Sequence, residues 1–117
     1  MSTDLPVWRR AVVKIGSSLI APDGQALSTR HLLDIARFIE RARASTREVV
    51  VVSSGAVASG RAALRARGEA VPEGIGGRQA LAAIGQAELM RFWARFFDFP
   101  VAQLLLTQDD LADRRRF

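Results

Sequence analysis

The apolar positions along the chain follow two different periods, which predicts strands separated by helices. Residues 10–16 form a short β-rich run, and Glu48 is followed by four consecutive valines, Val49 to Val52. A continuous apolar run of this kind is typical of a strand that is buried on both faces of a parallel sheet. Residues 101–106 are a further apolar run, so the sequence predicts three strands.

Apolar residues at helical spacing predict helices between these strands. The expected helices run from Ser28 to about Arg43, from Ala56 to about Arg67 and from Gln79 to Phe97. Ser28 or Thr29 is expected to cap the first of them. Turn residues at 22–24 and a glycine-rich loop at 68–77 separate the elements.

The predicted order of elements is β-α-β-α-α-β-α. Such alternation implies an α/β fold with a partial, doubly wound, mostly parallel sheet and helices on both faces. Thr107 and Asp110 have the spacing of a capping box, so a last helix is expected to begin there. Residues 1–9 are expected to form a tail and residues 10–117 a truncated domain, because the last segment carries no helix stop signal.

Composition narrows the chemistry that the chain can carry. It has no cysteine and one histidine, His31, which excludes thiolate chemistry and disfavours a histidine metal site. No run approaches the roughly 18 apolar residues of a membrane span, and the start lacks the apolar core of a signal peptide. We therefore expect a cytoplasmic protein with no membrane contact, and we assign no role to His31.

The net charge of +5 raises the question of nucleic-acid binding. The arginines are scattered at helical spacings, and their only dense cluster is Arg114 to Arg116. Aromatic residues make up 7% of the chain, and none alternates with basic residues on a strand as base stacking requires. We therefore expect no nucleic-acid partner.

Lys14 is the only lysine, whereas the other sixteen basic residues are arginine. It lies inside an apolar run, two residues before Gly16, and a lysine there needs either solvent or an anion. One interpretation is a lysine that protects an edge strand from unwanted pairing. Because arginine serves solubility elsewhere in the chain, a compact ammonium that binds a phosphate is the favoured interpretation.

Each predicted strand ends in small or polar residues, at the edge where ligands bind in doubly wound sheets. Gly16 and Ser17 follow the first strand, and Ser54 and Gly55 lead from the second into a helix beginning at Ala56. A turn at a helix start presents free backbone N–H groups and the positive end of the helix dipole to an anion. The simpler alternatives are a plain turn at Gly16 and a plain N-cap at Ser54.

Two other groups of residues have a simpler structural interpretation. Phe92, Trp93 and Phe96 recur at helical spacing and are expected in the core, with a dimer surface as the alternative. Carboxylates near the start of the last helix, at Asp109, Asp110 and Asp113, are expected to act as capping groups and not as metal ligands. We therefore predict no metal site formed by this chain.

The motifs together resemble a known family. Four collinear stretches between Val12 and Phe117 carry the resemblance: VVKIGSSLI, VVVVSSGAVASGRAAL, RQALAAIGQAELM and AQLLLTQDDLADRRRF. They are similar to the amino-terminal half of the glutamate 5-kinases, which belong to the amino acid kinase family. The second and third stretches are the more particular ones, whereas the first is shared loosely with other members of the family.

The resemblance implies transfer of the ATP γ-phosphoryl to the side-chain carboxylate of L-glutamate, giving L-glutamyl 5-phosphate. This is the first step of proline biosynthesis, requires Mg²⁺ and is typically inhibited by proline in a homo-oligomer. By the resemblance, Lys14 is catalytic and binds the ATP phosphates together with Gly16 and Ser17. Ser54, Gly55 and Ala56 would bind glutamate.

The resemblance also implies missing parts. A downstream aspartate, an Asn–Asp pair, a second phosphate-binding lysine and most of the nucleotide pocket have no counterpart here, so the isolated chain is expected to be inactive. The alternative is a non-catalytic, truncated relative that binds an amino acid or pairs with a complementing chain.

Overall fold

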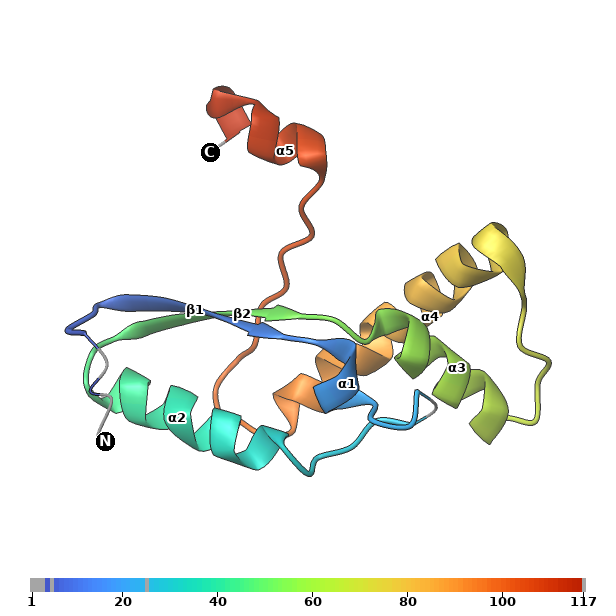
Figure 1. The fold of residues 1–117 in the computed structure, drawn as a ribbon, viewed down its shortest axis with the longest axis horizontal. Helices are drawn as coiled ribbons and strands as arrows, with labels where there is room; N and C mark the ends of the chain where they lie inside the picture. The colour runs from blue at the N-terminus through green and yellow to red at the C-terminus, as the bar shows by residue number, and fades with distance from the viewer. Residues whose placement is uncertain (1–3, 5, 25, 117) are drawn as a thin grey trace.

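The computed structural model describes residue 4, residues 6–24 and residues 26–116, and Figure 1 shows the arrangement of their helices and strands. Of the predicted tail, residues 1–3 and 5 lie outside the described residues. In chain order the elements are β1 (Arg10–Ile15), α1 (Ser17–Ile20), α2 (Leu32–Ala44), β2 (Glu48–Ser53), α3 (Ala56–Ala66), α4 (Gly74–Ala94), α5 (Gln108–Ala112) and the 3-10 helix η1 (Arg114–Arg116).

β1 and β2 form a parallel pair, with α1 and α2 in the connection between them. In the register of this pair, Arg10 lies opposite Glu48 and Ile15 lies opposite Ser53. The side chains of Arg10 and Glu48 also bond across the strands, with 2.6 Å between Nε and Oε2. The predicted α/β class and parallel strand pairing are confirmed.

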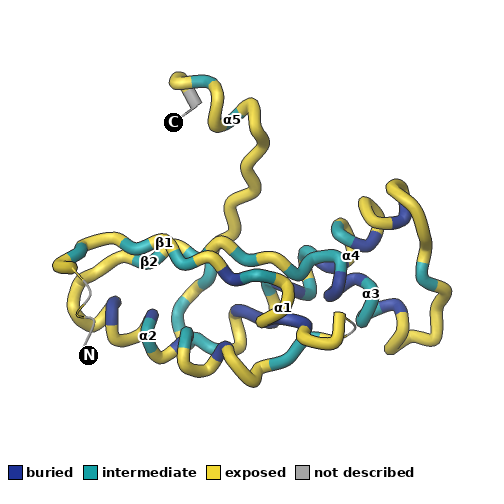
Figure 2. The backbone as a smooth tube through the Cα atoms, viewed as in Figure 1, coloured by how far each residue is buried: buried dark blue, intermediate teal, exposed yellow. Residues whose placement is uncertain are grey.

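The two faces of this sheet differ in how far they are covered. On one face Val13 and Val51 pack against the core, and Ile15 is buried. On the other face Val12 and Val52 are exposed by 67% and 49%, and the strands in Figure 2 alternate accordingly between exposed and partly buried residues. We refer to this second face, which carries Val12, Lys14, Val50 and Val52, as the open face.

The hydrophobic core lies between the covered face of the sheet, the start of α2 and the last turns of α4. Its buried members are Ile15, Ile20, Leu32, Leu89, Phe92 and Trp93. Phe92 and the half-buried Phe96 meet edge to face, with 5.5 Å between their ring centroids. The prediction that Phe92, Trp93 and Phe96 belong to the core is therefore confirmed, with Phe96 lying just beyond the end of α4.

α3 and α4 form a hairpin that extends beyond the ends of the strands (Figure 1). Two glycines allow the helices to touch through their backbones. A Cβ atom at Gly60 would lie 2.0 Å from the carbonyl oxygen of Leu81, and one at Gly85 would lie 1.7 Å from that of Ala56. α3 packs on α4, and no helix of the described residues covers the open face, where Val12 and Val52 are exposed.

The prediction of a third strand at 101–106 is wrong for this structure. The segment is extended but unpaired, and it leads away from the sheet to α5 (Figure 1). Leu104, Leu105 and Leu106 are exposed by 81%, 71% and 66%. An apolar run forms a strand only where a neighbouring strand accepts its backbone hydrogen bonds, and the two described strands bond only to each other.

The starts of two helices differ from the sequence predictions, and one short helix is additional. α4 begins at Gly74, inside the predicted loop 68–77, because Gly77 lets the first turn pack against the backbone of Pro72. α2 begins at Leu32 without a side-chain cap, while the Ser28 hydroxyl accepts a hydrogen bond from Arg30 N. The short helix α1 was not predicted.

The capping box at the start of α5 is confirmed. The Thr107 hydroxyl accepts a hydrogen bond from Asp110 N at 3.2 Å, and the Asp110 carboxylate accepts one from Thr107 N at 2.8 Å. Among the described residues, no helix is long and apolar enough to cross a membrane.

Candidate functional site

The carboxyl ends of β1 and β2 bring the two predicted turns side by side. Ser54 N donates a hydrogen bond to the carbonyl oxygen of Ile15 at 2.9 Å, which extends the strand pairing one residue beyond β2. Gly16 and Ser54 are therefore neighbours, although 38 positions separate them in the sequence. We refer to the residues around this junction, Lys14, Gly16, Ser17, Ser54, Gly55 and Ala56, as the strand-end corner.

Lys14 lies on the open face, directly opposite Val52, and its side chain is exposed. Within the described part of the chain, its ammonium group has no ion pair or hydrogen bond, in contrast to Arg10 on the same strand. An unpaired ammonium group is available to an anion. β1 is also an edge strand, so this geometry is compatible with the protective role as well.

Gly16 precedes α1 with an ordinary extended backbone, φ −76° and ψ 161°. A Cβ atom there would meet no described atom within 4 Å. Neither the backbone conformation nor the neighbouring atoms require glycine at this position. The open space above Gly16 is what a ligand close to the backbone needs. Ser17 follows as the exposed first residue of α1.

Gly55, by contrast, is required by the structure. It is the N-cap of α3 with φ 112°, and a Cβ atom there would lie 2.9 Å from Cγ2 of Ile20. α3 has no side-chain cap, so the alternative that Ser54 is a plain N-cap is wrong. Ser54 is exposed, and the first N–H groups of α3, beginning with that of Ala56, receive no capping side chain.

A second layer of residues lies beneath this turn, and none of them is among the site residues that the motifs predict. The Ser53 hydroxyl accepts a hydrogen bond from Nε1 of Trp93 at 2.8 Å and donates one to the carbonyl oxygen of Ser54 at 2.9 Å. The Ser59 hydroxyl donates to the carbonyl oxygen of Gly55 at 2.7 Å. Strand alternation directs Ser53 inward, and a buried tryptophan needs a hydrogen-bond acceptor. These two features of the sequence could have indicated the pair.

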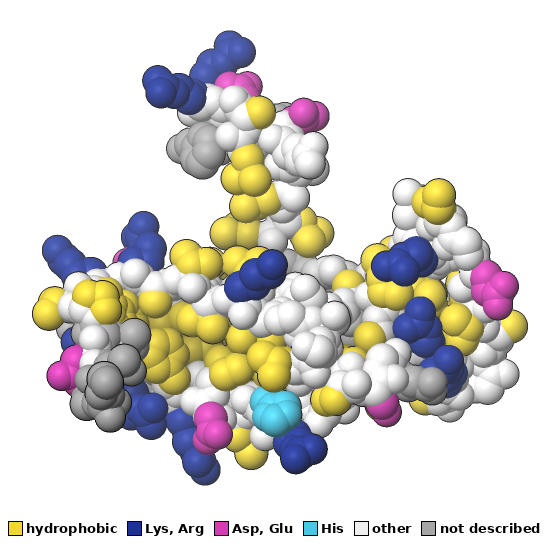
Figure 3. Space-filling view, viewed as in Figure 1, with side chains coloured by type: hydrophobic (Ala, Val, Ile, Leu, Met, Phe, Trp, Pro, Cys, Tyr) yellow, Lys and Arg dark blue, Asp and Glu magenta, His cyan; other side chains and the backbone are white. Residues whose placement is uncertain are grey.

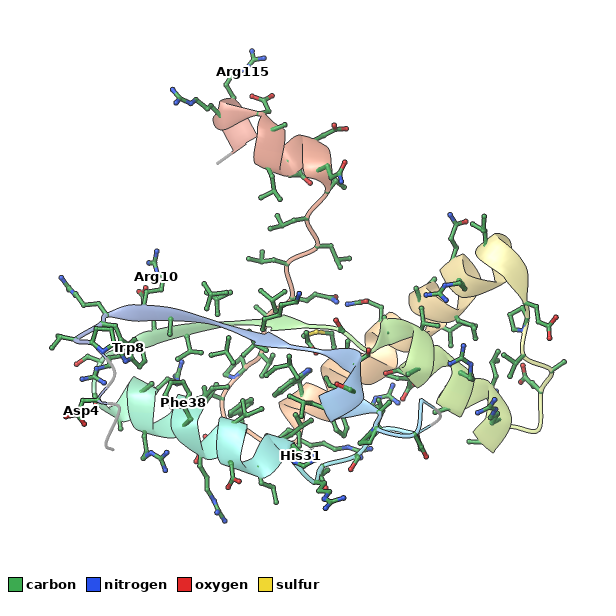
Figure 4. All side chains as sticks on the ribbon, in the orientation of Figure 1. Asp4, Trp8, Arg10, His31, Phe38 and Arg115 are labelled. Atoms are coloured by element: carbon green, nitrogen blue, oxygen red, sulfur yellow. The ribbon has the colours of Figure 1, made fainter. Side chains whose placement is uncertain are left out.

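Lys14, Ser17 and Ser54 are exposed in the strand-end corner, whereas Gly16, Gly55 and Ala56 are half-buried. Two hollows on the described surface, of about 570 and 150 Å³, are lined by residues from the end of the chain and from around Trp8, and neither includes Lys14 or Ser54. Figure 4 shows Trp8 and Phe38 at the opposite end of the strands from α1 and α3.

The described residues contain no group of three or more His, Cys, Asp or Glu side chains able to hold a metal ion. Asp110 is engaged in the capping box, and the Asp113 carboxylate accepts a hydrogen bond from Arg115 N at 2.9 Å. His31 is exposed and precedes α2. In Figure 3 the Lys and Arg side chains are spread over the visible face in several small groups.

Comparison with known proteins agrees with this geometry. Residues 9–117 match the amino acid kinase family. The chain is 54% identical over 112 residues to the glutamate 5-kinase of Idiomarina loihiensis, covering 96% of this chain and 30% of that protein. For the glutamate 5-kinase of Xylella fastidiosa strain M12 the identity is 55% over 116 residues, covering 97% and 29%.

The glutamate 5-kinase of Salinibacter ruber is 56% identical over 113 residues, which cover 97% of this chain and 30% of that protein. The chain therefore spans about 30% of the length of these curated relatives. The match of the family to nearly the whole chain, together with the parallel strands that carry the motifs, shows that this chain belongs to the amino acid kinase family.

Proposed function

We propose that this chain forms the glutamate-binding part of a glutamate 5-kinase, which transfers the γ-phosphoryl of ATP to the side-chain carboxylate of L-glutamate. The observation that carries the proposal is the strand-end corner, where an unpaired lysine and an uncapped helix start lie at neighbouring strand ends. Relatives that are 54–56% identical over nearly the whole chain carry this name. The product would be L-glutamyl 5-phosphate, for proline biosynthesis.

In this proposal Ser54, Gly55 and Ala56 hold glutamate, and Lys14 binds the phosphates with Gly16 and Ser17. A carboxylate oxygen attacks the γ-phosphorus, a new P–O bond forms, the bond to the β-phosphate oxygen breaks, and ADP leaves. No proton has to move, because the attacking carboxylate is already ionised. The work of the protein is then positioning and charge stabilisation, which suits a compact ammonium group beside two backbone turns.

The described residues do not form a Mg²⁺ site of their own, because they contain no cluster of metal-binding side chains. Mg²⁺ usually takes part of its coordination from the phosphates of the nucleotide. In the proposed enzyme the ion would neutralise phosphate charge, and the phosphoryl transfer would need no metal ligand from this chain. The remaining ATP-binding residues would come from the rest of the enzyme. That part corresponds to the roughly 70% of the relatives' length that this chain does not cover.

A chimeric enzyme, called the joined protein below, tests the proposal. This chain would replace the aligned region of the Xylella fastidiosa glutamate 5-kinase, and ADP formation would be measured with and without L-glutamate. We expect Lys14→Ala to lower the rate by about 10²- to 10³-fold, the usual effect of losing one group that stabilises transition-state charge. An unchanged rate would mean that Lys14 only protects the edge of β1.

Arg10→Ala is the matched control. Arg10 lies on the same strand and the same face as Lys14, and its replacement by alanine removes one positive charge, as Lys14→Ala does. Its exposed ion pair with Glu48 contributes little to stability. We expect this variant to keep the activity of the joined protein, which separates the position of the lysine from net charge.

The open face favours a second candidate, in which the chain pairs with a complementing chain without catalysis. Val12, Val50 and Val52 are exposed there, and Leu104 to Leu106 form a second exposed apolar group. Sedimentation of this chain with the remaining part of the Xylella fastidiosa enzyme would detect such a complex. A complex without glutamate-dependent ADP formation would favour this candidate.

Three further properties belong to the same proposal. The enzyme would act in the cytoplasm, as a homo-oligomer, and proline would inhibit it as the end product of the pathway. Inhibition is tested by adding proline to the joined protein, and the oligomeric state by its sedimentation coefficient.

A further inference from the structure

We infer that Trp93 is a positioning residue for the glutamate-binding turn: through the Ser53 hydroxyl it fixes the Ser54–Gly55 peptide so that the Gly55 N–H points into the strand-end corner. The inference rests on the proposed function for the identity of the ligand, a carboxylate. It adds two residues, Trp93 and Ser53, that are absent from the motif-based site. Neither would touch the substrate.

The direction of the hydrogen bonds follows from the groups involved. The indole Nε1 of Trp93 only donates, so the Ser53 hydroxyl must be its acceptor, at 2.8 Å. The hydroxyl proton is then left to donate, and the Ser54 carbonyl oxygen lies 2.9 Å away. Trp93 is 5% exposed, so water does not readily replace Ser53 as the partner of its N–H.

The orientation of the peptide follows from its planarity. In a trans peptide the C=O and N–H bonds point in opposite directions, and the described chain has no cis peptide. With the Ser54 carbonyl held by the Ser53 hydroxyl, the Gly55 N–H points the opposite way. Within the described residues no group accepts a hydrogen bond from it. It therefore joins the uncapped N–H groups at the start of α3 as a donor for an anionic oxygen.

The next peptide is fixed independently from α3. Ser59 is 1% exposed, and both its backbone N–H and its hydroxyl donate to the Gly55 carbonyl oxygen, at 2.9 and 2.7 Å. Ile20 fills the space where a Cβ of Gly55 would lie. Peptides on both sides of Gly55 are thus held before any ligand arrives, one from α4 and one from α3. A preformed donor set binds a carboxylate without a further loss of conformational freedom.

The test uses this chain labelled with ¹⁵N, because its two tryptophans, Trp8 and Trp93, give separate indole signals in an NMR spectrum. In Ser53→Ala the Trp93 indole signal should move upfield and exchange faster with water, and the Gly55 and Ala56 amide signals should shift. Trp93→Phe should cause the same amide shifts. Trp8, which contacts Phe38 and Arg47 at the other end of the strands, is the internal control.

L-glutamate is then titrated into each variant. We expect Trp93→Phe and Ser53→Ala to weaken binding by about three- to tenfold, as for the loss of one hydrogen bond. Ser53→Thr, which keeps the hydroxyl, should restore the affinity. Phe92→Leu is the packing control: it should lower the unfolding temperature and leave the affinity of the folded chain unchanged.

The outcomes separate this inference from the proposed function. Unchanged Gly55 and Ala56 amide signals in both Trp93→Phe and Ser53→Ala would overturn the inference, with or without a ligand. Equal affinity of these two variants and the original chain would overturn it as well. If the amide signals shift as expected but L-glutamate perturbs no signal of the original chain, the positioning of the turn holds and the proposed glutamate site fails.

Discussion

The backbone of Gly85 rests directly on the carbonyl oxygen of Ala56, so that a Cβ atom at Gly85 would lie 1.7 Å from that oxygen. Ala56 is the first residue of α3 and belongs to the strand-end corner. The contact therefore ties the start of α3 to the middle of α4. No side chain larger than hydrogen fits between them without moving one helix.

Gly85→Ala should destabilise the chain by about 3 kcal/mol, because the helices must separate to admit one methyl group. Gly76→Ala is the matched control in the same helix. A Cβ there would meet no described atom within 4 Å, so the helix propensity of alanine should stabilise the chain by about 0.5–1 kcal/mol. Urea unfolding of both variants measures the difference, and equal midpoints would contradict the close helix contact.

The two glycines of the strand-end corner should respond in opposite ways to alanine. Gly55→Ala should cost about 2 kcal/mol, because its φ of 112° is unfavourable for alanine and Ile20 occupies the space. Gly16→Ala should leave the unfolding free energy nearly unchanged and lower ADP formation in the joined protein. A large loss of stability in Gly16→Ala would show that Gly16 has a structural role.

The different exposure of the two sheet faces is tested at neighbouring positions of β2. Val51→Lys places a charge on the covered face, where it is removed from water, and should destabilise the chain by about 3 kcal/mol. Val50→Lys places the same charge on the open face, where Val50 is 45% exposed, and should change stability little. Thermal unfolding compares them, and a similar loss in both would mean that the open face is covered in solution.

The capping box at α5 should act locally. Thr107→Ala removes the hydroxyl that accepts from Asp110 N, which should cost about 1 kcal/mol of helix stability. Because the segment before α5 is exposed, we expect faster amide exchange in α5 with no change in global unfolding. Asp110→Ala should have the same effect, and the double variant should add little, since both act in one motif. A drop in global stability would contradict this.

Local chemistry made much of the fold predictable. Four consecutive valines indicated β2, and Thr107 with Asp110 indicated the start of α5. Each of these patterns is local to the element that it predicts. The segment 101–106 has the composition of a strand but no partner in this structure, and composition does not supply a partner. α4 begins earlier than predicted, at Gly74, where Gly77 allows a close approach of the first turn to the backbone of Pro72 that the glycine content of the segment does not indicate.

For the candidate site, the sequence points only to residues at the strand ends and not to the hydrogen bonds beneath them. The motifs point to Lys14 and Ser54, and their role in ligand binding stays a prediction. They did not identify Ser53, because a serine at the end of a strand has many ordinary explanations. Its partner Trp93 lies 40 positions away, and only the folded chain brings the two together.

Lys14 is also the only side chain of this protein that amine-directed reagents modify. Its side chain is exposed and carries the only lysine ammonium group in the sequence. Reductive methylation with a ¹³C-labelled reagent would therefore place one side-chain label on the protein, in addition to the terminal amine. The side-chain label would lie at the strand-end corner, and its NMR signal, distinct from that of the terminal amine, would report on this corner without any change to the sequence.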